Sequence, residues 1–282
     1  MGKAKVAVVF PVHNGAATLS ESLASIASQH LQDFKAIILE NGCTDNTFEI
    51  ALQFCEKDPR FSIVRNDHFL SANDNFAKAM ELAAVEGEYF CLRACDDLSS
   101  PDFLSALVEA LEQDSDKLVA VCSTQIVTRE GQKLAMKHPS SKVLNFLDLY
   151  KSGSVPRNLT YPGEWIYGVF RSAAKDTLVS RWHEFANPWC VASYTMSEFV
   201  VRDLVAYVSG PVFIFRKGSN SIERYGAKSF RDKLQQRLAY TFGCYKLVHK
   251  LPKVGLVRRL KFFRMCWNDA RRKTQYKLLR FF

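Results

Sequence analysis

The sequence of 282 residues lacks several features that would assign a class at once. Its longest nearly uncharged run, 204–215, is interrupted by Gly210-Pro211 and is shorter than the about 20 residues that a membrane-spanning helix needs. No hydrophobic signal segment precedes the first apolar run, so we do not expect export. The eight cysteines include no Cys-x-x-Cys pair and no histidine partners at zinc-finger spacing. This pattern indicates reduced core cysteines in a cytoplasmic protein.

Two nucleotide-binding fingerprints are also missing. The chain contains neither GxGxxG nor GxxxxGK[ST], which disfavours a dinucleotide-dependent oxidoreductase and a P-loop enzyme. Apolar residues make up 48% of the chain and charged residues 24%, a balance typical of globular proteins rather than of disordered, collagen-like or coiled-coil chains. The length allows one large domain with an appendage, or two small domains.

Acidic residues are scarce near the C-terminus. From Arg224 onward there are 17 Lys/Arg against Asp232 and Asp269, a net charge of +15, whereas the first 223 residues carry −6. An apolar stripe at helical spacing runs between the cations: Leu256, Leu260, Phe263 and Trp267. This composition is typical of a helix that lies on an anionic membrane surface. The alternative is a helix that covers the domain and turns a solvated basic face outward.

Short β-rich runs alternate with amphipathic helical patterns before this basic region. Strands are expected at 5–10, 36–39, 63–64, 89–92, 118–127, 165–170 and 204–215. Thr18 and Glu21 predict a capping box, and Pro101 predicts the first position of a later helix. The alternation predicts an α/β fold with a doubly wound, mainly parallel sheet and helices on both faces. We expect this domain to span 1–222, followed by a basic, helical C-terminal region, 223–282.

Polar clusters follow three of the predicted strands. They are Pro11-Val12-His13-Asn14, Glu40-Asn41-Gly42-Cys43-Thr44-Asp45 and Asp96-Asp97. Because ligands of such sheets bind beyond the carboxyl ends of the strands, we expect the three clusters to converge on one crevice. Adjacent carboxylates suit a hard divalent cation that keeps waters and phosphates as further ligands. A solvated turn or a helix cap is the structural alternative for the aspartate pair.

The order and surroundings of these clusters resemble those of a known enzyme family. Val8 to Gly15, with Ser22, Ser25 and Gln29 downstream, is similar to the first strand, loop and helix of glycosyltransferase family 2, whose members use nucleotide sugars on a GT-A fold. The second cluster resembles the second-strand motif of that family. Gly87-Glu88-Tyr89, Asp96-Asp97 and Pro101-Asp102-Phe103-Leu104 are similar to its metal-binding segment. The resemblance covers 5–130, continues more weakly to about 216, and does not extend into the basic region.

The resemblance implies roles for particular residues. The base and ribose of a nucleotide-sugar donor would lie against Pro11, Val12, His13, Glu40 and Asn41. Asp96 would approach the ribose or the sugar. Asp97 would act in catalysis by holding Mg²⁺ or Mn²⁺ on the diphosphate, where a cation stabilises the negative charge that develops as the donor bond breaks. Ala94 stands where the family often places another acidic residue.

The general base departs from the family pattern. An inverting transfer needs a group that takes the proton from the acceptor hydroxyl. The family's position for this group corresponds to Ala192 or Ser193, and neither can serve. The candidates nearby are His183, Glu184 and Glu198. We favour Glu184, because it precedes the loop signal Asn187-Pro188, whereas Glu198 is expected in the middle of a helix.

These features predict an inverting, metal-dependent glycosyltransferase of hexosyltransferase type that acts in surface polysaccharide synthesis. Its donor would be a nucleoside diphosphate sugar and its acceptor a glycan or a lipid-linked glycan. The basic region predicts a peripheral location on the inner face of the membrane. The competing hypothesis is a catalytically weak nucleotide-binding or nucleic-acid-binding module that uses the basic region. We do not expect nucleic acid as a partner, because no nucleic-acid-binding motif is visible.

Overall fold

The computed structural model describes residues 2–185, 187–218 and 226–274. Contacts divide the described chain into two compact units. The first unit contains 2–137, 167–180 and 206–218, and the second contains the rest. This division differs from the expected boundary at residue 222, because 138–166 and 181–205 pack with the C-terminal helices. The predicted basic region begins and ends outside the described residues, at 223–225 and 275–282.

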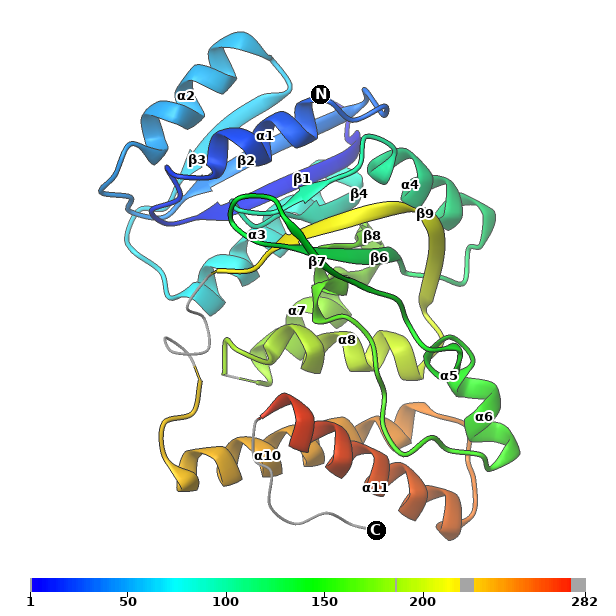
Figure 1. Cartoon of the computed structure of the whole chain (residues 1–282). Coiled ribbons are helices and arrows are strands. Elements are labelled where there is room, and N and C mark those ends of the chain that lie inside the picture. The colour runs from blue at the N-terminus through cyan, green and yellow to red at the C-terminus, as the bar shows by residue number, and fades with distance from the viewer. Residues whose placement is uncertain (1, 186, 219–225, 275–282) are drawn as a thin grey trace. The chain divides into compact units, whose positions relative to one another are not determined.

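A mixed sheet forms the centre of the first unit (Figure 1). Its strand order is β3-β2-β1-β4-β8-β6-β9-β5, and β7 pairs with β6. The strands are β1 (Ala4–Val12), β2 (Phe34–Glu40), β3 (Phe61–Arg65), β4 (Gly87–Leu92), β5 (Leu98–Ser99), β6 (Val119–Val127), β7 (Lys133–Lys137), β8 (Val169–Arg171) and β9 (Val205–Arg216). Strands β1 to β4 pair in parallel, whereas β8 pairs antiparallel with β4 and β6. The mainly parallel half of the predicted sheet is therefore the half that carries the polar clusters.

Helices cover both faces of this sheet. Val6, Val8 and Phe10 of β1 belong to one buried cluster with α1 (Leu19–Ala27), α2 (Thr47–Lys57) and α4 (Phe103–Gln113). Helix α3 (Ala72–Glu86) packs against β1 and β4 and buries small residues and Met80 there. Figure 1 shows α1 and α2 on the same side of the sheet. The continuous apolar run in β1 is explained by this double coverage.

Three local predictions differ from the structure. Thr18 precedes α1 but makes no side-chain cap bond, and the Glu21 carboxylate pairs with Arg216, far along the chain. Helix α4 begins at Phe103, two residues after Pro101. Residues Gly163–Tyr167 form a 3₁₀ helix, η1, in place of the first part of a predicted strand.

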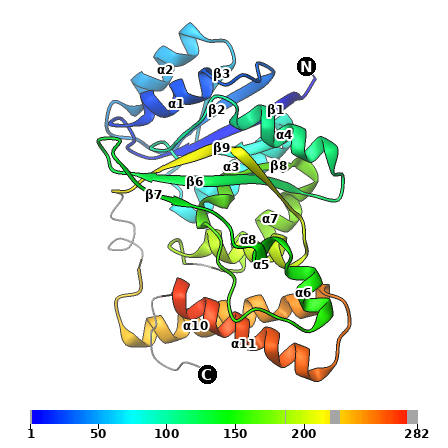
Figure 2. The same ribbon diagram turned by 45° about the vertical axis from the view of Figure 1, so that its right-hand side comes forward.

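Helices make up the second unit. They are α5 (Ser141–Leu144), α6 (Phe146–Ser152), η1, the end of α7 (Lys175–His183), α8 (Val191–Val201), α10 (Phe230–Tyr245), η3 (Lys246–Lys250) and α11 (Leu256–Lys273); η2 (Ser172–Ala174) belongs to the first unit. Helix α8 is buried along nearly its whole length. Helices α10 and α11 lie side by side in both views (Figures 1 and 2). Within the described ranges, no helix is long and apolar enough to span a bilayer.

The predicted apolar stripe on α11 divides into two parts. Leu256 and Leu260 are exposed, whereas Trp267 is buried. A different stripe faces the core of the unit: Phe262, Met265, Cys266, Asp269 and Ala270. Helix α11 is therefore a structural part of the second unit that also leaves apolar side chains in solvent. Each of the eight cysteines is free, and five of them are buried.

Candidate functional site

The first two polar clusters meet where β1 and β2 end. Val12 and Glu40 are partners in the parallel register of the two strands, so the loops that follow them start side by side. His13 Nδ1 lies 2.9 Å from the Asn41 carbonyl oxygen. The Thr44 amide donates to Asn14 Oδ1 at 2.8 Å, and Asn14 adopts a left-handed backbone with φ 52°. The two loops thus form one hydrogen-bonded rim, as the sequence predicts.

Glu40 is almost fully buried at this rim. Its carboxylate accepts hydrogen bonds from the Cys43 amide and, at 3.0 Å, from Arg65 Nε. Burial alone would raise the pKa of Glu40, but these hydrogen bonds and the charge of Arg65 lower it below its usual range. The carboxylate is therefore an ionised group that ties the β2 loop to the end of β3.

Asn41 is buried in the same way. Its Nδ2 donates to the Leu70 carbonyl and its Oδ1 accepts from the Leu70 amide, both at 2.9 Å. Asn66 Nδ2 also donates to this Oδ1 at 2.9 Å. The Asn41 side chain therefore fixes the loop after β3. Contact of Glu40 and Asn41 with a nucleoside stays a prediction, and their visible role is to position that loop.

The residues of the first polar cluster differ in their exposure to solvent. Pro11 and Val12 are buried at the end of β1, whereas His13 and Asn14 are exposed. Phe69, in the loop that Asn41 fixes, contacts the His13 ring with 4.9 Å between ring centroids. The sequence pattern does not mark this loop as part of the site, because the loop follows a short strand and contains no pair of acidic residues. An aromatic residue just after a parallel strand was the available signal.

The acidic pair follows β4 and reaches the same rim. A Cβ added to Gly15 would lie 2.9 Å from Cys95 Sγ, so the β1 loop and the acidic loop are in close contact. Asp97 is buried, with 1% of its surface exposed, and its Oδ1 accepts from the Arg216 amide at 3.0 Å. Asp97 is thus more deeply embedded than a free loop carboxylate. Asp96 is half-buried; burial raises its pKa, and the charges of Arg216 and Arg129 act in the opposite direction.

Two serines of α1 and Gln29, which follows the helix, hold the acidic loop, residues 94–100. Ser22 Oγ donates to the Asp97 carbonyl at 2.7 Å and is 3.1 Å from the Ala94 carbonyl. Gln29 Nε2 donates to the Ser100 carbonyl at 2.9 Å. Between them, Ser25 Oγ accepts from the Ser99 amide at 3.0 Å. Ser22 and Ser25 lie one turn apart on α1, and Gln29 follows two residues after the helix ends at Ala27.

The carboxylates of the acidic loop suit a hard cation that is also coordinated by waters and phosphate oxygens. Within the described parts of the chain, no group of three His, Cys, Asp or Glu could hold a metal ion. Mg²⁺ characteristically binds through one or two carboxylates and completes its shell with waters and phosphate oxygens. Asp96 and Asp97 supply two carboxylates, and burial of Asp96 disfavours its charged form without a cation nearby. These residues therefore fit Mg²⁺ or Mn²⁺, with Asp97 as the predicted ligand.

The candidates for the general base lie in or beside the second unit's helices. Glu184 follows α7, and its Oε2 accepts from Arg181 Nη1 at 2.6 Å and from the Tyr194 hydroxyl at 2.8 Å. Its side chain remains 44% exposed. His183 is exposed at the end of α7. Glu184 belongs to the second unit, whereas all the other predicted site residues belong to the first.

Glu198 has a different environment. It lies within α8, as predicted, and is 0% exposed. Its carboxylate pairs with Lys250 at 2.7 Å, with Arg202 at 2.8 Å and with Arg181 Nε at 3.6 Å. Three cations around one buried carboxylate are characteristic of a structural ion-pair network. Of the three candidates, Glu184 combines a carboxylate, solvent access and orienting hydrogen bonds.

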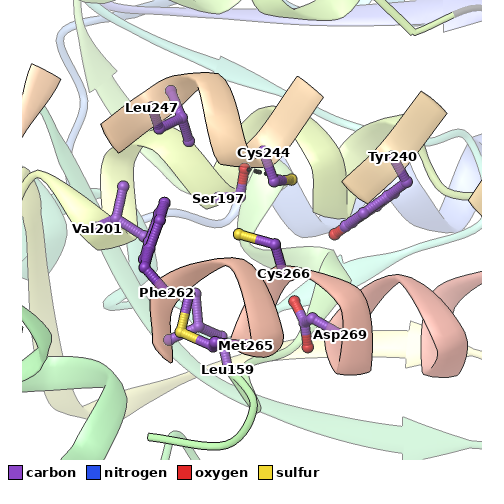
Figure 3. A pocket seen from close by; sticks show the side chains of 10 residues that line it. All are labelled: Leu159, Ser197, Val201, Tyr240, Cys244, Leu247, Phe262, Met265, Cys266 and Asp269. Carbon is purple, nitrogen blue, oxygen red and sulfur yellow. Dashed lines mark hydrogen bonds between the residues drawn. The ribbon is translucent and has the colours of Figure 1, made fainter. Parts of the chain in front are cut away.

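A small cavity lies inside the second unit (Figure 3). It has a volume of about 10 Å³, and helices α8, α10 and α11 contribute most of its lining. Figure 3 shows Asp269, Cys266 and Tyr240 on its wall. The volume corresponds to about one water molecule, so this cavity is too small for a nucleotide.

The chain is similar to known proteins in sequence and in fold. The family model described as Glycosyl transferase family 2 matches residues 7–178. The glycosyltransferase GlyG of Streptococcus pneumoniae serotype 4 is 28% identical over 115 residues, which are 40% of this chain and 38% of GlyG. The alignment thus spans about two fifths of the length of this relative.

Two solved structures have the same fold. S. aureus TarS 1–349 in complex with UDP-GlcNAc gives a TM-score of 0.63 at 13% identity, covering 92% of this chain and 70% of TarS. The mannosyltransferase PcManGT from Pyrobaculum calidifontis, in complex with GDP-Man and Mn²⁺, gives 0.53 at 14% identity, covering 98% of this chain and 73% of PcManGT. At these identities the likeness concerns the fold, which is the GT-A fold of glycosyltransferases.

Proposed function

Because this chain belongs to glycosyl transferase family 2 and is a glycosyltransferase, we propose that it transfers a sugar from a nucleoside diphosphate donor to a glycan or a lipid-linked glycan in surface polysaccharide synthesis. The observation that carries the proposal is the meeting of three polar clusters at one edge of the parallel half-sheet. His13, Asn41 and the acidic loop reach this edge from three neighbouring strands. The fold relatives hold UDP-GlcNAc and GDP-Man, which supports a nucleotide sugar as the donor class.

The first unit would bind the donor. His13 and the loop that Glu40 and Asn41 position would hold the nucleoside, with Pro11 and Val12 beneath. Asp96 would face the ribose or the sugar, and Asp97 would hold Mg²⁺ or Mn²⁺. Such a cation supplies positive charge to the departing diphosphate, which is worth several kcal/mol in a site that excludes water. Mn²⁺ beside GDP-Man in PcManGT supports this cofactor class.

The second unit would provide the proton acceptor. Glu184 would take the proton of the acceptor hydroxyl while the new bond to the anomeric carbon forms and the bond to the donor phosphate breaks, which inverts the configuration. Arg181 and the Tyr194 hydroxyl hold the Glu184 carboxylate in place through hydrogen bonds of 2.6 Å and 2.8 Å. Solvent access leaves this carboxylate open to an acceptor, whereas the buried Glu198 already has three cationic partners.

The helical pair α10 and α11 would bring the enzyme to the inner face of a membrane. Its exposed large apolar side chains are Phe230, Leu238, Phe242, Leu256, Val257 and Leu260. Cations lie on the same two helices, including the exposed Arg231 and Arg259. Exposed apolar residues among cations favour an anionic lipid surface over RNA, because phosphate binding needs no exposed leucine or valine. A membrane location would also give access to a lipid-linked acceptor.

Nucleotide binding tests this function. In a thermal-shift panel, UDP, GDP, CDP and dTDP are added with and without Mn²⁺. Because a ligand that binds only the folded protein raises its melting temperature, we expect one nucleotide to give the largest shift and Mn²⁺ to increase that shift. AMP and inorganic phosphate serve as controls for unspecific anion binding. No shift with any of the four diphosphates, at millimolar concentration and with Mn²⁺, would contradict a nucleotide-sugar donor.

A further inference from the structure

An aromatic ring is exposed to solvent at the strand edge, which is the edge of the sheet where the parallel strands β1 to β4 end. Phe69 is 61% exposed, and it is the one aromatic residue among the exposed large hydrophobic side chains in the described part of the first unit. It lies in the loop after β3, so it occupies the same edge of the parallel strands as His13 and Asn41. An exposed apolar side chain needs no explanation when it is isolated, but this one has specific neighbours.

The loop that carries Phe69 is firmly held. Both backbone groups of Leu70, the next residue, are hydrogen-bonded to the Asn41 side chain at 2.9 Å. Asn66, three residues before Phe69, donates to Asn41 Oδ1 at 2.9 Å and to Asn75 Oδ1 at 2.9 Å. Asn41 is itself buried. A loop fixed on both sides of an exposed ring presents that ring in a defined place.

The ring belongs to a corner of two aromatic side chains. The His13 and Phe69 rings are inclined at 64°, with 4.9 Å between their centroids. Gly42 lies beside them with φ +65°, and a Cβ added there would be 3.8 Å from the Phe69 side chain. The left-handed backbone of Gly42 suits glycine, and glycine adds no side chain to the corner. A flat molecule can lie on one ring while its edge meets the other.

We propose that Phe69 is a stacking residue for the nucleobase of the donor, with His13 at the edge of the base. This inference rests on the proposed function and adds one residue, Phe69, to its nucleoside site. A nucleobase is planar, and stacking on an aromatic side chain is sequence-tolerant because every base has a π-face. Phe69 therefore strengthens the binding of any base, whereas His13, through its ring nitrogens, determines which base is preferred. Glu40 and Asn41 act on the base indirectly, through the loop that they hold.

Replacement of the ring tests the proposal. Calorimetric titration measures the affinity of wild type, Phe69→Ala and Phe69→Trp for the nucleoside diphosphate that wild type prefers, and for pyrophosphate, both with Mn²⁺. Loss of one stacked base lowers affinity by about 5-fold to 100-fold, so Phe69→Ala is expected to bind the nucleotide that much more weakly. Its affinity for pyrophosphate should equal that of wild type, because the ring does not contact phosphates. Val85→Ala is the matched control, since Val85 is also 61% exposed in the first unit.

Fluorescence adds a direct signature. In Phe69→Trp the new indole is expected to retain nucleotide affinity and to be quenched when the nucleotide, but not pyrophosphate, is added. The four native tryptophans provide the background, which wild type measures. Equal nucleotide affinity in wild type and Phe69→Ala, or an indole that does not respond, would overturn the stacking role while the donor site stands. If wild type binds none of the nucleotides, the donor site itself fails and the subsite with it.

Discussion

Different kinds of contact stabilise the strand edge of the first unit and the helices of the second unit. At the strand edge, short polar motifs bond to neighbouring loops, as in the bonds from His13 and Asn14 to the loop after β2. In the second unit, the contacts join helices through a buried ion pair between Glu198 and Lys250 and through Arg237, which lies over the Trp267 ring at 3.9 Å. Substitutions at the strand edge should therefore change binding, whereas those in the helical unit should change stability, except at Glu184.

The two units also differ in the charge that they carry. The strand edge collects carboxylates, and burial raises the pKa of the half-buried Asp96 there. The helical unit collects cations, and it buries Glu198 among three of them. In the proposed function, the donor would bind the acidic strand edge, and an anionic membrane would contact the basic helices.

The largest expected effect is that of Glu184→Gln. If this carboxylate is the general base, turnover falls by about 10² to 10⁴, the range of proton-transfer catalysis, while donor affinity stays unchanged. The amide oxygen can still accept from Arg181 and Tyr194, so the fold should be retained. Steady-state kinetics of sugar transfer measure this, with Asp176→Asn, at an exposed carboxylate of α7, as the control. Near-normal turnover in Glu184→Gln would remove it from the reaction.

Glu198→Ala should destabilise the helical unit by about 3–5 kcal/mol, because it leaves the buried Arg181 with one carboxylate fewer. Urea unfolding followed by tryptophan fluorescence reports on this unit, since Trp165, Trp182, Trp189 and Trp267 all lie in it. Glu184→Gln is the matched control: it shares the partner Arg181, but its half-exposed pair is worth about 1 kcal/mol or less. Equal urea midpoints for Glu198→Ala and Glu184→Gln would show that the buried ion pair stabilises the unit no more than the half-exposed one.

Asp269→Asn should stabilise the second unit in a pH-dependent way. Burial raises the pKa of Asp269 to about 6, and the charges of Lys273 and Arg272 act in the opposite direction. The folded state therefore binds the proton more tightly than the unfolded chain, and stability is lost as pH rises from about 4 through 6. The variant should gain up to about 3 kcal/mol over wild type at pH 7.5 and little at pH 4. A gain that is the same at both pH values would contradict the raised pKa.

The smallest effect is expected on the exposed face of α11. Leu260 is 59% exposed, so Leu260→Ser should leave the melting temperature unchanged and weaken attachment to anionic vesicles by roughly tenfold. Co-sedimentation with vesicles with and without phosphatidylglycerol, at low and high salt, measures this. Leu52→Ser, at an exposed position of α2, is the control. Deleting both helices would be a poorer test, because they supply core residues such as Tyr240 and Phe262.

The sequence predicts the strand edge better than the helical unit for a physical reason. The apolar run of β1 identifies a strand covered on both faces, and parallel strands bring their carboxyl ends together, so the meeting of the three clusters follows from local pattern. In the helical unit, the ion pair between Glu198 and Lys250 joins residues 52 positions apart and has no local signal. Likewise, α11 carries two apolar stripes, and only its packing partners decide that Phe262 and Cys266 are buried while Leu256 stays in solvent.

The most direct test of the central claim is the cation dependence of donor binding at Asp97. Calorimetry compares wild type and Asp97→Asn, each titrated with the preferred nucleoside diphosphate with and without Mn²⁺, and Asp33→Asn controls for loss of an exposed carboxylate in the same unit. The asparagine keeps an oxygen that can accept from the Arg216 amide, so the loop should stay in place. We predict that Mn²⁺ strengthens binding in wild type and Asp33→Asn and has no effect in Asp97→Asn. An undiminished effect of Mn²⁺ in Asp97→Asn would contradict the account.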